Sequence, residues 1–177
     1  MHICIAIQKL IETKAIHFIK RKEATMLDLK YEFLCDIDVD LEEPIDVGST
    51  PHGVRMIYNI KGGTVEGPII SGKVLPTGAD WLIIRPDMAA ELDVRATMQT
   101  NDNEIVYIYY RGIINATPEV FDKVQKGEDV DPSEYYFRTT PVFETSSEKY
   151  GWLNRIVAVG VGKLAKNRVI YEVYMIL

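Results

Sequence analysis

The chain has 177 residues, of which 47% are apolar and 26% charged, a composition typical of a folded domain that excludes disorder along most of the length. The formal net charge of -6 opposes binding to nucleic acid, and no sequence stretch forms a basic patch, so we expect no nucleic acid partner. No stretch reaches the roughly 18 to 20 apolar residues of a membrane-spanning helix, and the N-terminus lacks the features of a secretory signal. We therefore expect no membrane association and a cytoplasmic location, which also fits two cysteines, Cys4 and Cys35, without disulfide-framework or zinc-site spacing.

Residues 1–25 differ in charge from the rest of the chain, because they carry a net +3 whereas residues 26–177 carry -9. Apolar residues between Ile7 and Ile19 recur at helical spacing. A short amphipathic helix and a loosely attached N-terminal extension both fit this segment. The first clear strand begins near Met26, so we predict an extension over 1–25 and one domain over 26–177.

The first half of this domain has the alternation and the turn residues of a β-sheet. Apolar and charged residues alternate from Leu27 to Asp38, which is typical of a strand with one buried face. After an acidic run that ends at Pro44, we expect a loop that contains His52. Strands are then expected at 54–60, 67–75 and 81–85, with turns at 61–63 and 76–78.

The second half continues the pattern and contains the one predicted helix. An alternating strand at 91–100 and a tyrosine-rich strand at 104–113 flank Asn101-Asp102-Asn103, a turn signal, and form a hairpin. Thr117 followed by proline predicts a helix N-terminus, with the helix running to about Lys126. Further strands are predicted at 135–145, 154–163 and 168–176. Eight or nine short strands and a single short helix predict an all-β fold, a closed or nearly closed antiparallel β-barrel.

Charged and aromatic residues within these strand-like segments are candidates for a small-molecule pocket inside the barrel. The candidate ligand contacts are His52, Arg55, Trp81, Arg85, Asp87, Arg95, Tyr109 and Trp152. The candidate catalytic residues are Arg138, Glu144 and Tyr107. An arginine suits a carboxylate or enolate, and a carboxyl or phenol group with a shifted pKa transfers protons. The alternative is that these side chains face water, since alternation does not say which face of a barrel with a polar interior points inward.

Three stretches of the chain resemble a known family. They are GSTPHGVRMIYNIKGGTVEGPIISGKVLPTGADW, RPDMAAELDVRATMQTND and YYFRTTPVFETSSEKYGWLN. Together they are similar to uncharacterised protein family 0311, also called domain of unknown function 3237, over about Leu27 to Leu177. The resemblance implies a lipocalin-like or calycin-like β-barrel and carries no established catalytic residues. The sequence departs from the family at Met88, where relatives tend to have a glycine after the aspartate.

Two hypotheses for function follow. The first is a barrel that binds a small organic acid or carbonyl compound and acts by proton transfer as an isomerase, cyclase or lyase. No cofactor or metal is expected, because the sequence contains no nucleotide-binding, zinc-protease or nucleophile-elbow motif. The second is a binding module without catalysis, in which the aromatic residues of 135–152 form a homodimer interface.

Overall fold

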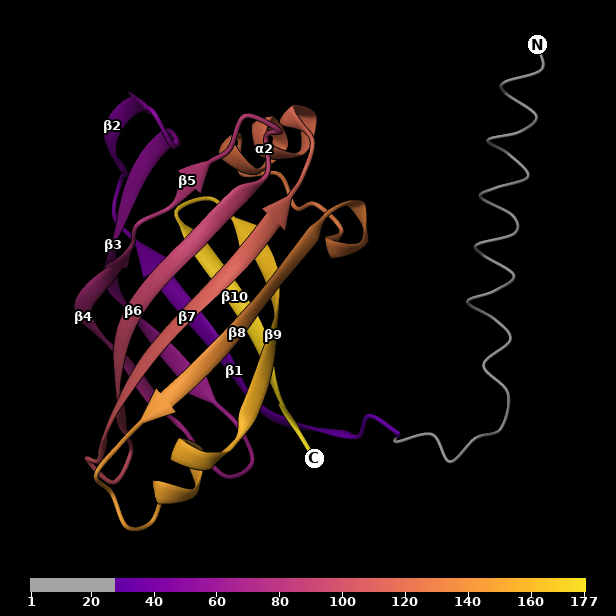
Figure 1. The fold of residues 1–177 in the computed structure, drawn as a ribbon. Helices are drawn as coiled ribbons and strands as arrows, with labels where there is room; N and C mark the ends of the chain where they lie inside the picture. Colours follow the sequence, from indigo (N-terminus) through magenta and orange to yellow (C-terminus); the bar gives the residue numbers. More distant parts are fainter. Residues whose placement is uncertain (1–27) are drawn as a thin grey trace.

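The computed structural model describes residues 28–177, so the predicted N-terminal extension or helix lies outside the described residues. The described chain contains ten strands and one α-helix (Figure 1). The strands are β1 (Tyr31–Leu41), β2 (Ile45–Thr50), β3 (Gly53–Glu66), β4 (Gly72–Asp80), β5 (Ile83–Ile84), β6 (Ala90–Thr100), β7 (Ile105–Asn115), β8 (Tyr136–Glu144), β9 (Val157–Ala165) and β10 (Arg168–Ile176). The helix is α2 (Pro118–Gln125), and short 3-10 turns lie at Pro132–Glu134 and Gly151–Arg155. No helix within 28–177 is long and apolar enough to cross a membrane.

The strands close into an eight-stranded antiparallel barrel. Their order is β1-β10-β9-β8-β7-β6-β4-β3, and β1 pairs with β3 as well as with β10, which closes the circle. Strand β2 extends beyond this circle by pairing with β3, and β5 bridges β3 and β6. The predicted all-β barrel is therefore confirmed.

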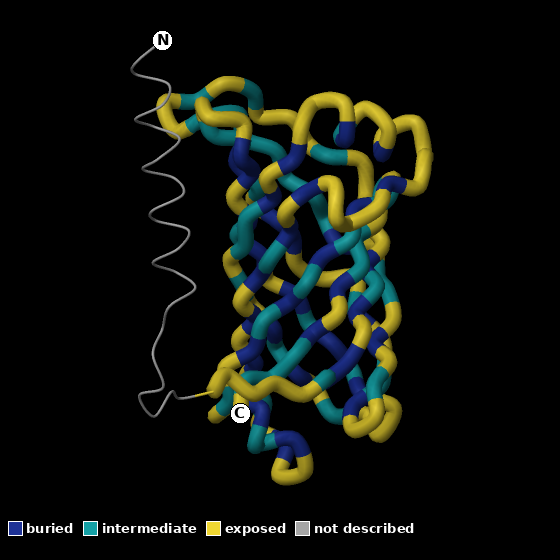
Figure 2. The backbone as a smooth tube through the Cα atoms, turned by 90° about the vertical axis from the view of Figure 1, so that its right-hand side faces the viewer, coloured by how far each residue is buried: buried dark blue, intermediate teal, exposed yellow. Residues whose placement is uncertain are grey.

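The core lies inside the barrel because one face of each strand is apolar. In β6 the residues Leu92, Val94 and Met98 are buried, whereas the charged residues between them lie on the outer face. The same alternation of buried and exposed positions runs along the barrel wall in Figure 2. Because the charged residues of β6 face outward, the predicted site residue Arg95 lies on the outer wall of the barrel.

Strand β2 and two glycine-containing segments differ from the sequence prediction. Residues 45–50 form β2 rather than part of a loop. Gly62-Gly63, predicted as a turn, lies within the continuous strand β3, and a β-carbon on Gly63 would come within 1.9 Å of the carbonyl oxygen of Asp38 on β1. Glycine thus permits the close approach of β1 that closes the barrel. The predicted turn at 76–78 is an irregularity within β4, where Gly78 has a φ of 89°.

Helix α2 forms where the sequence predicted it and lies at one end of the barrel (Figure 1). The hydroxyl of Thr117 accepts a hydrogen bond from the amide of Val120, which confirms the predicted N-cap. After the C-cap at Lys126, Gly127 adopts a φ of 80° and the helix ends. Val120 and Val124 are buried, so this helix is packed onto the barrel rather than projecting from it.

Candidate functional site

The strand register places four inward-facing residues in one row across the interior. Tyr58 on β3 lies opposite Asp80 on β4, Asp80 lies opposite Val94 on β6, and Val94 lies opposite Tyr110 on β7. A fourth polar residue, Tyr171, is buried on β10 on the other side of the barrel. One carboxyl and three phenol groups therefore share an interior that is otherwise largely apolar.

Asp80 is a carboxyl group that is almost fully removed from water. Its side chain accepts a hydrogen bond of 3.0 Å from the amide of Asp93. Burial raises the pKa of Asp80 to about 7, while the amide of Asp93 and the nearby charge of Arg55 act in the opposite direction. A carboxyl with this pKa exchanges its proton near neutral pH, which is the property required of a general base or acid.

Two of the tyrosines form a hydrogen-bonded pair across the interior. The hydroxyl groups of Tyr110 and Tyr171 lie 3.0 Å apart, and the two rings pack edge to face at 5.6 Å. Burial raises the pKa of both groups above the usual value for tyrosine, so both stay protonated at neutral pH. Only one proton can lie between the two oxygens, which leaves the other hydroxyl free to donate to a bound molecule.

These groups line an interior cavity of about 110 Å³ at the α2 end of the barrel. The walls include Tyr58, Asp80, Tyr110 and Tyr171 together with aliphatic side chains, and α2 contributes Phe121, Val124 and Gln125. An apolar cavity of about 150 Å³ in another protein binds benzene, so the space here suits a molecule of roughly one small ring. Because α2 forms part of the wall, displacement of α2 would enlarge the cavity.

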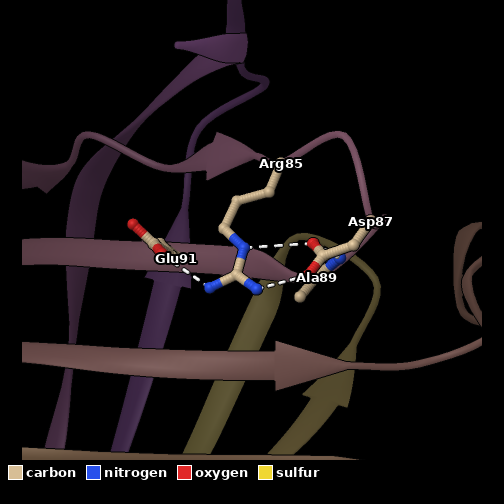
Figure 3. Close-up of polar contacts among 4 residues, drawn as sticks. All are labelled: Arg85, Asp87, Ala89 and Glu91. Atoms are coloured by element: carbon tan, nitrogen blue, oxygen red, sulfur yellow. Dashed lines mark hydrogen bonds and ion pairs between the residues drawn. The ribbon is translucent and has the colours of Figure 1, made fainter.

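Four of the predicted ligand contacts meet at the outer rim of the barrel. His52, Arg55, Arg85 and Asp87 line one shallow hollow there. The guanidinium of Arg85 bonds both oxygens of Asp87 and, at 2.8 Å, the carboxylate of Glu91 (Figure 3). The hydrogen bonds from Arg85 hold the pKa of Asp87 below the usual value. The donors of Arg85 are thus used in fixing the loop that connects β5 to β6.

Met88, at which the sequence departs from the glycine of its relatives, lies in the same loop. Met88 adopts a φ of 69°, a left-handed conformation that glycine enters without steric penalty. The amide of Met88 donates to the carbonyl of Arg85, and the amide of Ala89 donates to Asp87. The loop therefore keeps a tight turn here with a non-glycine residue at the strained position.

Apart from Trp152, which lies in the 3-10 turn at Gly151–Arg155, the remaining predicted site residues lie on the outer wall, and the expectation that they point into the barrel is wrong for those on β6, β7 and β8. Arg95 pairs with Asp93 at 2.6 Å and lies over the ring of Trp81. Tyr107 stacks on Tyr109. The positions of the other residues are as follows: Arg138 lies over Tyr136, Glu144 is exposed opposite Tyr107, and Trp152 packs against the edge of the core. The physical reason is that these charged and phenolic side chains occupy the outer positions of each strand, while the alternate positions carry the core.

The interior group was missed from the sequence because its tyrosines resemble ordinary core residues and its carboxyl group follows turn-type residues. Tyr110 does carry a signal: it follows Tyr109 directly, and it shares the inward face with Val106 and Ile108. Asp80 follows three turn-type residues and precedes Trp81, which suggests a loop rather than a strand end facing the interior. Within 28–177, no cluster of three or more histidine, cysteine, aspartate or glutamate side chains has the arrangement of a metal site.

The fold and the cavity define the class of this protein as a small antiparallel β-barrel with a partly polar interior. The family described as protein of unknown function DUF3237 matches residues 29–176, and the chain belongs to this family. A UPF0311 protein of Rhodopseudomonas palustris is 40% identical over 151 residues, covering 85% of this chain and 97% of that protein.

Solved structures show the same barrel. A conserved protein of unknown function from Rhodopseudomonas palustris superposes with a TM-score of 0.81 at 38% identity, covering 86% of this chain and all of that chain. A β-barrel-like protein from Acinetobacter baumannii gives 0.76 at 36% identity, with 88% of this chain and 100% of that chain covered. An enzyme from Penicillium herquei gives 0.65 over 88% of this chain and 100% of that chain, and at 20% identity this likeness concerns the fold alone.

Proposed function

We propose that the chain is an enzyme that binds a small carbonyl compound or organic acid in the barrel interior and transfers a proton with Asp80 as general base. The observation that carries the proposal is a buried carboxyl group whose pKa is raised to about 7, placed on the wall of a cavity beside three phenol groups. Isomerisation, cyclisation and elimination next to a carbonyl group all begin with such a proton transfer. The Penicillium herquei neighbour offers one example of an enzyme with this fold.

Each group has a separate role in the proposed reaction. The Asp80 carboxylate removes a proton from a C–H or O–H group of the substrate and returns it at a second atom. The free hydroxyl proton of the Tyr110–Tyr171 pair donates a hydrogen bond to the oxygen on which negative charge develops. The aliphatic walls and α2 exclude water, which strengthens both interactions.

Proton transfer can be measured without knowing the natural substrate. A panel of small cyclic and aryl ketones is incubated with the protein in D₂O, and deuterium uptake next to the carbonyl group is followed by NMR. We expect exchange of at least one ketone to be accelerated, and Asp80→Asn to reduce the rate by at least about 100-fold, the usual contribution of a general base. The rate should rise with pH through the pKa of Asp80 near 7, because the base acts in its deprotonated form.

Control variants separate this site from the outer wall. Asp36→Asn changes a carboxylate on the outer face of β1 and should keep the full rate. Arg138→Gln and Glu144→Gln test the residues that the sequence predicted as catalytic. Loss of exchange in these two variants, with a normal rate in Asp80→Asn, would move the reaction to the outer wall and end the proposal for the interior.

A further inference from the structure

A second hollow, of about 840 Å³, lies on the outside of the barrel wall. Its side chains come from separate strands and include Arg55, Trp81, Arg111, Tyr136, Arg138 and Thr140. On β7 and β8, Ile113 lies opposite Arg138, and Arg111 lies opposite Thr140. Arg111 and Arg138 are thus diagonal neighbours on adjacent strands, with backbones roughly 7 Å apart.

The arginines of this hollow lack carboxylate partners among the described residues. Arg55, Arg111 and Arg138 take part in none of the ion pairs of residues 28–177. Arg138 donates to the carbonyl of Phe137 at 2.8 Å, and Arg55 donates to the carbonyl of Trp81.

The two acidic residues that line the hollow are already paired with other arginines. Glu91 accepts from Arg85 at 2.8 Å, and Asp93 accepts from Arg95 at 2.6 Å. The hollow is therefore a local site of positive charge on a chain whose formal net charge is -6. The sequence could not show it, because its arginines come from three different strands.

We propose that this hollow binds a small aromatic carboxylate, with Arg111 and Arg138 holding the carboxylate. Neither guanidinium forms an ion pair within residues 28–177, although Asp93 lies opposite Arg111 across the β6–β7 pair. The planar fork of arginine matches a carboxylate with paired hydrogen bonds. Trp81 and Tyr136 border the same hollow and remain partly exposed, with Arg95 over one ring and Arg138 over the other, so the uncovered part of each ring is open to an aromatic group. The volume lies within the range of about 300 to 1,000 Å³ that is usual for ligand pockets.

Titration calorimetry with benzoate tests the proposal, and benzamide serves as the neutral probe of the same shape. Wild-type protein should bind benzoate and not benzamide. Arg111→Gln and Arg138→Gln should each weaken benzoate binding at least tenfold, because each removes one charged donor from the carboxylate. Backbone amide NMR signals of Gly112 and Thr139, which line the hollow, should shift during the titration.

Two matched variants separate this site from general charge effects and from the interior cavity. Arg155→Gln removes an arginine from the 3-10 turn at Gly151–Arg155 and should leave benzoate affinity unchanged. Val124→Ala enlarges the interior cavity and should also leave it unchanged. Equal affinity of the wild type and both Arg111 and Arg138 variants, equal binding of benzamide, or loss of binding in Val124→Ala alone would each overturn the proposal. Displacement of benzoate by sulfate at equal ionic strength would show an unspecific anion effect and would overturn it as well.

Discussion

Asp80 lies on the wall of the interior cavity, where burial disfavours its charged form. Because burial raises its pKa to about 7, the folded protein binds a proton that the unfolded chain releases near pH 4. The free energy of unfolding therefore falls as pH rises from about 4 to 7.

Replacement of Asp80 by asparagine should remove that dependence. We expect Asp80→Asn to raise the free energy of unfolding at pH 8, by up to roughly 4 kcal/mol, and to change it little at pH 4. The amide oxygen can still accept the hydrogen bond from Asp93. Urea unfolding of both proteins at the two pH values measures the difference. An equal effect at pH 4 and pH 8 would contradict the raised pKa.

The hydroxyl groups of Tyr110 and Tyr171 depend on each other. Removing one leaves the other as a buried donor without its partner, whereas removing both leaves no polar group to satisfy. We expect Tyr110→Phe and Tyr171→Phe each to lower the free energy of unfolding by about 1 to 2 kcal/mol, and the double variant to lose clearly less than the sum. Denaturant unfolding of the four proteins gives the coupling energy. Strict additivity would show that the two hydroxyls do not interact.

Strands β8 and β9 form the weakest seam of the barrel wall. Their ladder contains only the pairs Arg138 with Val161 and Thr139 with Gly160, while β6 and β7 pair along ten positions. The ladder between β8 and β9 ends before Pro141. Proline has no amide proton to donate, and at this position beyond the ladder no hydrogen bond to β9 is lost. Inside this seam the fully buried ring of Phe137 lies against Gly162.

A methyl group at Gly162 should disturb this contact. Its β-carbon would lie 2.4 Å from the ring of Phe137, which itself packs on Tyr171. We expect Gly162→Ala to lower the free energy of unfolding by about 1 to 3 kcal/mol, as overpacked cores do. Gly151→Ala is the control, because no atom lies within 4 Å of its added methyl group. Thermal unfolding of both variants measures the effect, and equal midpoints would show that the seam can adjust.

Sequence analysis located best those elements whose local sequence pattern favours the same structure as their packing in the barrel. In β6 strict alternation coincides with one buried face, and Thr117 starts α2 with its own hydrogen bond. Strand β2 was missed because Gly48, Ser49 and neighbouring prolines favour turns, and only pairing with β3 holds it extended. The inward direction of Asp80 was missed because a carboxyl on an interior face has no local signal.

At the scale of the whole molecule, the two ends of the barrel differ. Helix α2 lies at one end (Figure 1) and contributes to the wall of the cavity, whereas the turn between β6 and β7 lies at the other end. There Asp102, in the turn between β6 and β7, accepts hydrogen bonds from Lys149 at 2.6 Å and Tyr150 at 3.0 Å. These donors hold the pKa of Asp102 well below its usual range. In the proposed enzyme, the substrate would therefore reach the cavity from the α2 end.

The pairing of β1 with β10 also determines when this architecture can arise. Tyr31 lies opposite Ile176, so two segments separated by almost the whole described chain must meet before the circle is complete. Long-range pairing of this kind requires the loss of chain entropy before its contacts form, so we expect slow folding. The interior cavity has Tyr171 of β10 in its wall, and it is enclosed only once this pairing is made.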